Sequence, residues 1–150
     1  MNKIFNSSFE TGLRVLLLLS SIQPQAATID RITAYDFITI YGRDFGVSKN
    51  NLHGDSNFNF SELASKRTNC NEGIKEFVLE GLISIKRTEE GFTYSLNQSG
   101  KKYVESLSSD YAAQYLEISK EVHQKFSSVS DEEIINLINK KAINELRRKS

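Results

Sequence analysis

The sequence predicts a mainly α-helical protein with one small β-hairpin, and three observations predict this class. Residues 82–96 hold two short strands of alternating pattern around a loop that ends at Gly91, which is typical of a hairpin. Residues 70–80 and residues 98–126 place apolar side chains at spacings of 3 or 4, which is typical of helices.

The order of elements within residues 60–107 narrows the fold. Ser61 is suited to cap a short helix, residues 66–69 are expected to form a turn, and a second helix follows to about Glu80. Gly81 can take the left-handed conformation that ends such a helix. With the hairpin as its wing, this order predicts a winged helix-turn-helix. The wing residues expected to face the core are Ile83, Ile85, Phe92, Tyr94 and Leu96.

Two helices are expected before this unit. The first covers residues 8–22, where Ser7 and Glu10 form a capping box and apolar side chains cover most faces, which predicts a central, buried helix. The only proline, Pro24, ends it, and the second helix runs from about Thr28 to Gly42.

A cleaved secretory signal is an alternative interpretation of the N-terminus. Lys3, Arg14 and a run of apolar residues imitate one. The acidic Glu10 and the shortness of that run, five residues before a Ser pair, favour a folded helix instead. No segment reaches the roughly 20 apolar residues that a membrane-spanning helix needs.

The segment after the second helix is polar. Residues 43–59 are rich in Gly and Asn, which predicts a long surface loop held to the body by Phe45, Leu52 and Phe58. His53 has no second ligand at metal spacing, so no metal site is expected there. The single Cys70 lies on an apolar helical stripe, which indicates a buried structural thiol in a reducing compartment, and we expect a cytoplasmic protein.

The C-terminal part is expected to be helical throughout. Residues 98–126 predict one helix about 40 Å long, more than a small body can cover, and a last helix follows the capping box of Ser130 and Glu133. We therefore expect a winged body with two N-terminal helices over residues 1–107 and a helical extension over residues 108–150. The two last helices either pack on each other as an antiparallel hairpin or present a surface to a partner. The candidate partner-binding residues are Tyr111, Tyr115, Ile118, Val122, Ile135, Ile138 and Leu146.

Composition and motifs argue against catalysis. Lys plus Arg and Asp plus Glu number 19 each, so the net charge is zero, and a general polyanion binder is not expected. The sequence holds no Gly-rich phosphate loop, no pair of metal ligands at the required spacing and no nucleophile elbow. His123 is expected to be solvated on a charged helical face. We expect a protein that is not an enzyme and that needs no cofactor and no small-molecule substrate.

Charge also argues against sequence-specific DNA binding. The helix expected to enter the major groove, residues 69–80, carries Lys75 against three carboxylates, a net charge of −2. Contacts with DNA are expected to be weak or indirect. The candidate contacts with the DNA backbone lie at the periphery and are Lys66, Arg67, Lys86 and Arg87.

The N-terminal residues carry a resemblance. Residues 5–19, which begin Phe5-Asn6-Ser7-Ser8-Phe9-Glu10, resemble the middle component, of the second type, of bacterial ABC-three-component systems. The resemblance continues through residues 30–37, Asp44-Phe45-Gly46 and the winged segment, and so covers about residues 4–107.

This resemblance implies a small non-enzymatic subunit. Members of the family act beside an SMC-like ATPase and an effector, often a nuclease, as in the Lamassu type of anti-phage defence. It implies that the ATPase senses DNA and that the small subunit couples this state to the effector. Within the shared string, Phe5 and Phe9 are expected to pack inward, Gly12 to permit the close approach of another element, and Arg14 to pair with an acid such as Asp36.

Three hypotheses follow. The first is an adaptor subunit of such an ATPase–effector complex. The second is a transcriptional regulator that binds DNA through the winged helix itself, and the third is a secreted helical protein that loses its first 27 residues. The DNA affinity of the isolated protein separates the first two, and the mass of its N-terminus tests the third.

Overall fold

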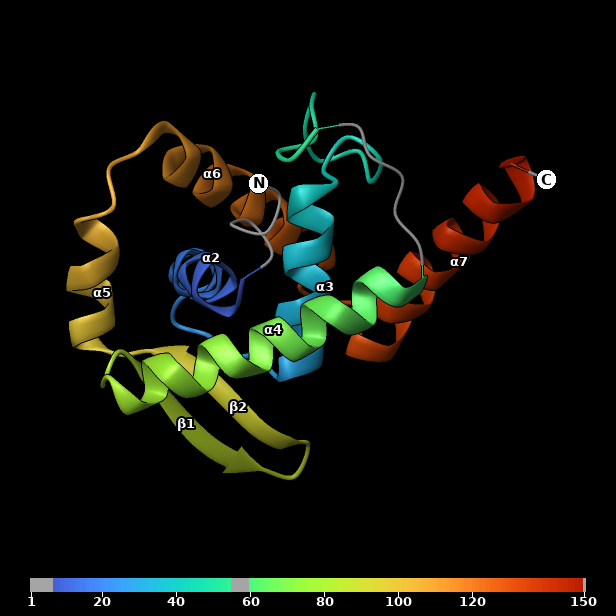
Figure 1. Ribbon diagram of the computed structural model, residues 1–150. Helices are drawn as coiled ribbons and strands as arrows, with labels where there is room; N and C mark the ends of the chain where they lie inside the picture. The colour runs from blue at the N-terminus through green and yellow to red at the C-terminus, as the bar shows by residue number, and fades with distance from the viewer. Residues whose placement is uncertain (1–6, 55–59, 150) are drawn as a thin grey trace.

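The computed structural model describes residues 7–54 and 60–149, and within them it is mainly helical with one antiparallel hairpin (Figure 1). The expectation of a mainly α-helical protein with one small β-hairpin is thereby confirmed. The elements are α2 (Ser8–Ser21), α3 (Ile29–Ile40), α4 (Phe60–Leu79), β1 (Ile83–Thr88), β2 (Gly91–Leu96), α5 (Gln98–Glu105), α6 (Asp110–Phe126) and α7 (Asp131–Lys149).

Helix α2 is the centre of the molecule, as its pattern predicts. Its residues from Val15 to Leu19 are buried, and α3, α4, α5 and α6 all contact it (Figure 1). The hydroxyl of Ser7 accepts a hydrogen bond of 3.1 Å from the Glu10 amide, which confirms the expected N-cap. A helix that is apolar on most faces needs partners on most sides, and this one has them.

Helices α2 and α4 cross at two glycines. A Cβ atom at Gly73 would lie 2.7 Å from the Cα of Gly12 and 2.7 Å from the carbonyl oxygen of Ser8. Both of those atoms belong to backbone, so neither can move aside as a side chain could. The role expected for Gly12, to permit the close approach of another element, is confirmed, and that element is α4.

Helix α4 is continuous, so the turn expected at residues 66–69 is wrong. Those residues include no Gly or Pro that would end a helix. Lys66 instead occupies the buried stripe one turn before Cys70, and Cys70 lies one turn before Ile74. The stripe therefore extends further towards the N-terminus than its apolar residues alone indicate. Phe60 and Ser61, expected to start the first helix, have side chains outside the described ones.

The hairpin forms where it is expected. Gly81 and Gly91 both adopt positive φ, at 78° and 105°, and Ile83 pairs with Leu96 at the base of the hairpin. Two backbone hydrogen bonds between Ala27 and Tyr94, of 2.8 and 2.9 Å, tie β2 to the segment before α3.

Only the base of the hairpin packs on the core. Ile83, Tyr94 and Leu96 are buried as expected, whereas Ile85 is 47% exposed and Phe92 is 51% exposed. The expectation for these last two is wrong. Ile85 lies opposite Tyr94 but on β1, whereas it is β2 that is tied to the segment before α3, and Phe92 lies nearer the tip, where the hairpin projects below α4 (Figure 1).

The single long helix expected at residues 98–126 is also wrong. The chain turns at residues 106–109, and the hydroxyl of Ser109 caps α6 by accepting a hydrogen bond of 3.1 Å from the Ala112 amide. A serine hydroxyl that caps a new helix favours such a break. Because of this turn, α6 crosses back over α2 and α3.

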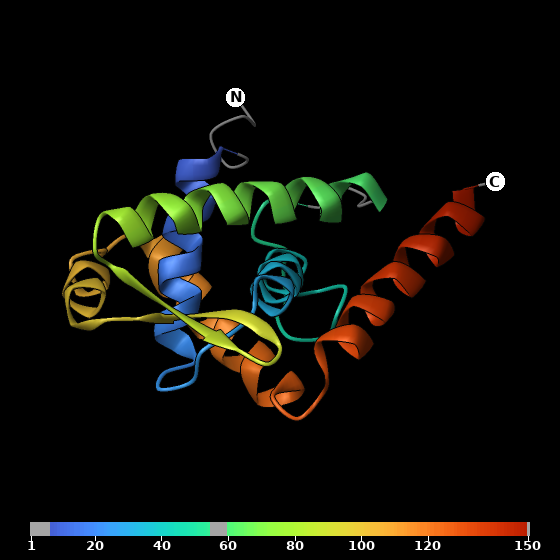
Figure 2. The ribbon, with the colours of Figure 1, turned by 90° about the horizontal axis from the view of Figure 1, so that it is seen from below.

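Helix α7 packs on α3 and buries Ile134, Ile138 and Ala142, and its C-terminal end then projects from the body (Figures 1 and 2). The amide of Glu133 donates to the Ser130 hydroxyl over 3.1 Å, which confirms the expected cap. Since α6 and α7 each pack on α3 instead of along one another, the antiparallel helix pair does not form. Among the described residues, no helix is both long and apolar enough to span a bilayer.

Candidate functional site

A buried ionic cluster joins four helices. The Arg14 guanidinium of α2 donates to both carboxylate oxygens of Asp36 of α3, over 2.9 and 3.2 Å. The Tyr115 hydroxyl of α6 donates to Asp36 over 2.5 Å, and the Lys66 ammonium of α4 lies 4.0 Å from the same carboxylate. Arg14, Asp36 and Tyr115 are almost inaccessible to solvent. The expected pairing of Arg14 with Asp36 is confirmed.

The electrostatics of this cluster fix its charge state. Burial opposes ionisation of Asp36, but the positive charges of Arg14 and Lys66 and the hydrogen bonds outweigh it and lower the pKa of the carboxyl to about 2. Burial also opposes the charge of Arg14, yet Asp36 holds the pKa of the guanidinium above its ordinary value. Groups that stay ionised at neutral pH are poorly suited to proton transfer, so this cluster acts as a cross-link between helices.

His53 lies beside the cluster. Its Nε2 is 2.6 Å from the Tyr111 hydroxyl, and burial together with the charges of Arg14 and Lys66 lowers the pKa of His53 to about 4. The neutral imidazole of His53 is hydrogen-bonded to Tyr111 and so holds the loop after α3 against α6. Within the described residues, no group of three or more His, Cys, Asp and Glu side chains is arranged to hold a metal ion.

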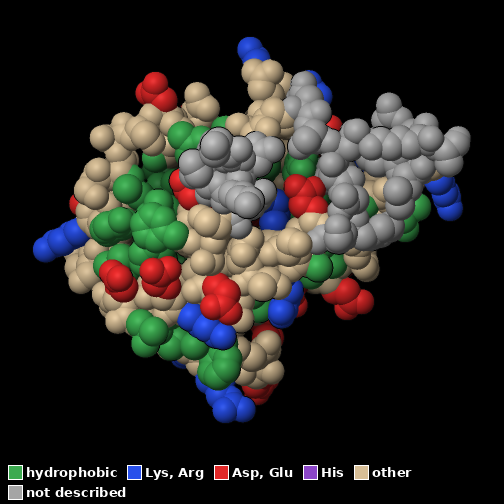
Figure 3. Space-filling view, viewed as in Figure 1, with side chains coloured by type: hydrophobic (Ala, Val, Ile, Leu, Met, Phe, Trp, Pro, Cys, Tyr) green, Lys and Arg blue, Asp and Glu red, His purple; other side chains and the backbone are tan. Residues whose placement is uncertain are grey.

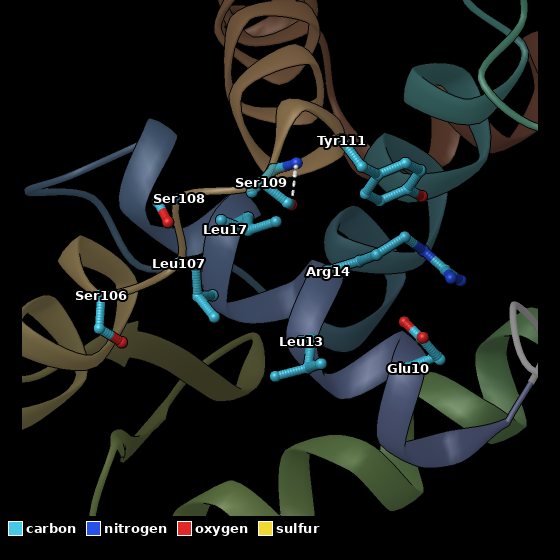
Figure 4. Close-up of a pocket in the computed structure, with 10 residues that line it drawn as sticks. Glu10, Leu13, Arg14, Leu17, Ser106, Leu107, Ser108, Ser109 and Tyr111 are labelled. Atoms are coloured by element: carbon cyan, nitrogen blue, oxygen red, sulfur yellow. Dashed lines mark hydrogen bonds between the residues drawn. The ribbon is translucent and has the colours of Figure 1, made fainter.

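A first surface hollow, the α2–α6 cleft, has a volume of about 500 Å³. Leu13, Leu17 and Leu107 supply much of its lining, with Tyr111 at one end (Figure 4). Arg14 also borders it, but its guanidinium already donates to Asp36 and to Thr11. The cleft therefore offers mainly apolar contact. Its lining residues are Glu10, Leu13, Arg14, Leu17, Ser106, Leu107, Ser108, Ser109, Tyr111 and Ala112.

A second surface hollow, the α4–hairpin groove, has a volume of about 460 Å³ and lies between α4 and the face of the hairpin. Leu79 at its edge is 88% exposed, and Ile85 and Phe92 are about half exposed. Figure 3 shows hydrophobic side chains gathered below α4 over the hairpin, with Lys and Arg side chains above and below them. The lining residues are Asn71, Ile74, Lys75, Val78, Leu79, Ile85, Phe92 and Tyr94.

The candidate partner-binding residues do not form one surface. Tyr115, Val122 and Ile138 are core residues, because α6 and α7 turn this stripe towards α2 and α3. Tyr111, Ile118 and Ile135 are half-buried against that core. The side chain of Leu146 lies outside the described ones.

The candidate DNA-backbone residues are also separated. Lys66 is buried beside Asp36, and exposed Arg67 pairs with Asp30 over 2.9 Å. Lys86 and Arg87 are exposed on β1, where the Arg87 guanidinium lies 5.9 Å from the centre of the Phe92 ring. Lys66 therefore offers no contact to DNA at this surface.

Several other expectations are corrected. His123 is half-buried, not solvated, and its Nδ1 lies 3.0 Å from the Tyr35 hydroxyl. Phe9 is about half exposed although its ring contacts that of Phe77, and Phe5 lies outside the described residues. The groove formed by Leu79, Ile85 and Phe92 was not expected, because periodicity assigns the hairpin pair to the core. The available signal was Leu79, an apolar residue off the helical stripe.

The described residues form a small helical body with two mainly apolar surface hollows, and such exposed apolar surface is typical of sites of contact with other proteins. The profile of the family described as ABC-three component (ABC-3C) system Middle Component 2 matches residues 4–148. Because this match spans nearly the whole chain, the chain belongs to that family. No match is found among curated proteins or among solved structures.

Proposed function

We propose that the protein is a non-enzymatic adaptor subunit of a cytoplasmic anti-phage complex of the Lamassu type. Its partners in this proposal are an SMC-like ATPase that senses DNA and an effector such as a nuclease, and the subunit couples one to the other. Membership of a middle-component family supports a role beside other components. The structural observation that carries the proposal is the apolar α4–hairpin groove, whose exposed Leu79 and Phe92 are suited to contact with a partner.

We further propose a winged-helix arrangement that is shifted along the chain. In it, α3 and α4 are the two helices of the motif, separated by the long loop, and the Ala27–Tyr94 bridge takes the place of the first strand. The hairpin is then the wing. The element order and the bridge support this assignment. The two helices of the motif are then α3 and α4, and not two short helices within residues 60–80, where α4 is continuous.

The charge of α4 favours protein over DNA as its partner. Outside the buried Lys66, the helix carries Arg67 and Lys75 against Glu62, Glu72 and Glu76. DNA binding needs a series of cations along the helix to contact successive phosphates, and α4 as a whole carries more carboxylates than exposed cations. The transcriptional regulator, which reads DNA alone, therefore remains the less favoured function.

Two measurements test the adaptor function. The protein co-expressed with the ATPase and effector encoded beside it should co-purify with them as one complex. Alone, it should bind duplex DNA no tighter than the nonspecific range of about 10⁻⁴ to 10⁻⁶ M at physiological salt, measured by fluorescence anisotropy. Sequence-selective binding by the isolated protein at nanomolar concentration would overturn the proposal in favour of the regulator.

A further inference from the structure

We propose that the α4–hairpin groove is the docking site for an amphipathic helix of a partner subunit, with Asp or Glu residues beside the apolar stripe of that helix. This inference rests on the proposed adaptor function and adds to it the place of contact and the chemistry of the partner. Three features of the groove carry it: its apolar exposure, its shape and its charge.

The exposure is concentrated at this groove. The exposed large hydrophobic side chains of the described residues are Phe9, Leu79, Ile85, Phe92 and Ile143, and three of these five border the groove. Leu79 has nearly its whole side chain in solvent at the last residue of α4. Such residues contribute little to the fold of the isolated chain, and a contiguous exposed apolar patch is typical of an interaction surface.

The shape suits a helix. Asn71, Ile74, Lys75, Val78 and Leu79 lie at spacings of 3 and 4 along one face of α4, which extends over about 12 Å. The hairpin supplies the opposite wall through Ile85, Phe92 and Tyr94, while buried Ile74 and Tyr94 form the floor. The groove walls consist of side chains and offer few backbone groups for hydrogen bonding. A ligand that fits here therefore needs a backbone that is already hydrogen-bonded within itself, as in a helix. About two turns of a helix with apolar residues at i, i+3 or i+4, and i+7 meet that requirement.

The charge of the groove favours acidic residues beside the apolar stripe of the partner helix. Lys75 is the charged member of the lining, and no carboxylate lines the groove among the residues that the structure describes. On the hairpin side, Arg87 lies against the exposed Phe92 ring. The Glu72 Oε1 atom lies 4.0 Å from the Lys75 Nζ atom and offsets part of the positive charge of Lys75. Both side chains are mostly exposed, so solvent weakens this pairing. An apolar stripe bordered by carboxylates complements cations on both walls, and a basic helix is disfavoured.

Matched variants test the groove within the complex. Leu79→Glu and Lys75→Glu each change an exposed side chain of the groove. The controls Ala113→Glu and Lys101→Glu introduce the same glutamate at exposed positions on α6 and α5. We expect the groove variants to weaken binding to the ATPase–effector complex at least tenfold for Leu79→Glu and several-fold for Lys75→Glu. All four should melt at the temperature of the wild type, and the two control variants should bind normally. Normal binding by both groove variants would overturn the inference.

Cross-linking identifies the occupant. A benzoylphenylalanine residue in place of Leu79, irradiated in the assembled complex, should attach to a helical partner segment with Asp or Glu within one turn of its apolar residues. Replacing that partner acid with Lys should restore binding to the Lys75→Glu variant. Attachment to a basic segment, to an extended strand or to a second copy of this chain would overturn the inference.

The two proposals fail in distinguishable ways. If the wild type forms no complex with the neighbouring ATPase and effector, the adaptor function and the docking site are both overturned. If the wild type forms that complex and both groove variants join it unchanged, only the docking site is overturned.

Discussion

Asp36 shows what the sequence indicates of a single residue and what it does not. The pairing with Arg14 is predictable, because a buried arginine on a mostly apolar helix needs a nearby acid, and Asp36 lies on the next helix. The approach of Tyr115 and Lys66 is not, since both come from helices whose direction is set by tertiary packing. In the sequence, Lys66 interrupts the apolar stripe of α4. In the structure, its side chain is buried in line with Cys70 and Ile74 and so belongs to that stripe.

Removing the charge of Asp36 should destabilise the protein strongly. In the Asp36→Asn variant the guanidinium of Arg14 stays buried without its counterion, and such a loss costs about 3–5 kcal/mol of unfolding free energy. Urea denaturation at pH 7 measures it. The control is Asp30→Asn, which breaks the exposed pair with Arg67 and should cost less than about 1 kcal/mol. Equal effects of the two substitutions would contradict the importance of the buried cluster.

Stability should fall as the pH falls, in two steps. His53 has a pKa of about 4 in the folded protein against an ordinary 6.5, so the unfolded chain takes up a proton first and stability declines from about pH 6.5 to pH 4. Asp36, with its pKa lowered from 3.8 to about 2, contributes stability that is complete above pH 3.8 and is lost as the pH falls towards 2.

The first step can be assigned with His53→Gln. Between pH 7 and pH 4.5 the wild type should lose roughly 1–3 kcal/mol more unfolding free energy than this variant. Between pH 7 and pH 8.5, where His53 is neutral in both states, the two profiles should run parallel. Parallel profiles over the acidic range as well would exclude His53 as the titrating group.

At the scale of elements, the sequence predicts helix caps and turns correctly but does not predict how deeply each side chain is buried. Capping by Ser7 and Ser130 and the positive φ of Gly81 and Gly91 depend on adjacent residues, and these expectations hold. Whether Phe92 reaches the core depends on how far the helices extend over the hairpin, which no period-two pattern contains. The break at residues 106–109 is not predicted either, because its serines are compatible both with a continuous helix and with the cap of a new one.

The α2–α4 crossing should be intolerant of any side chain at Gly73. In Gly73→Ala the added methyl meets backbone atoms of Gly12 and Ser8, so the helices must separate, which we expect to cost about 1–3 kcal/mol despite the better helix propensity of alanine. The control on the exposed face of the same helix, Ser65→Ala, should be neutral or slightly stabilising. A more stable Gly73→Ala variant would show that the crossing is looser than described. Thermal melts of both variants decide this.

At the scale of the whole molecule, Arg31 sets the direction of α7. Its guanidinium donates to Asp131 over 2.6 Å, to the Phe126 carbonyl over 3.1 Å and to the Val129 carbonyl, so one side chain of α3 holds the turn between α6 and α7. Thr28 also donates to Asp131 over 2.6 Å. These contacts span about a hundred residues of sequence. Periodicity therefore predicts helices in this part of the chain but leaves open whether the last two pack on each other or face a partner.

Replacing Arg31 with alanine should loosen the start of α7. Without the guanidinium, the carbonyls of Phe126 and Val129 each lose one hydrogen bond, and we expect amide hydrogen exchange over residues 127–135 to become about tenfold faster. Exchange in α2 should change much less, and Lys120→Ala on the exposed face of α6 should leave both segments unchanged. Uniform acceleration across the chain would indicate global destabilisation instead of a local hinge.

The buried Cys70 makes it possible to measure by thiol labelling how often helix α4 opens. It is the only cysteine of the chain, it has no exposed surface, and burial raises the pKa of its thiol to about 12. A thiol reagent can therefore reach it only when α4 opens, so the labelling rate measures how often that helix detaches from the core. Cys70 lies one turn before Ile74, the floor of the α4–hairpin groove. A ligand that fills the groove should slow labelling without touching the sulfur, and one that binds elsewhere on the surface should leave the rate as it was.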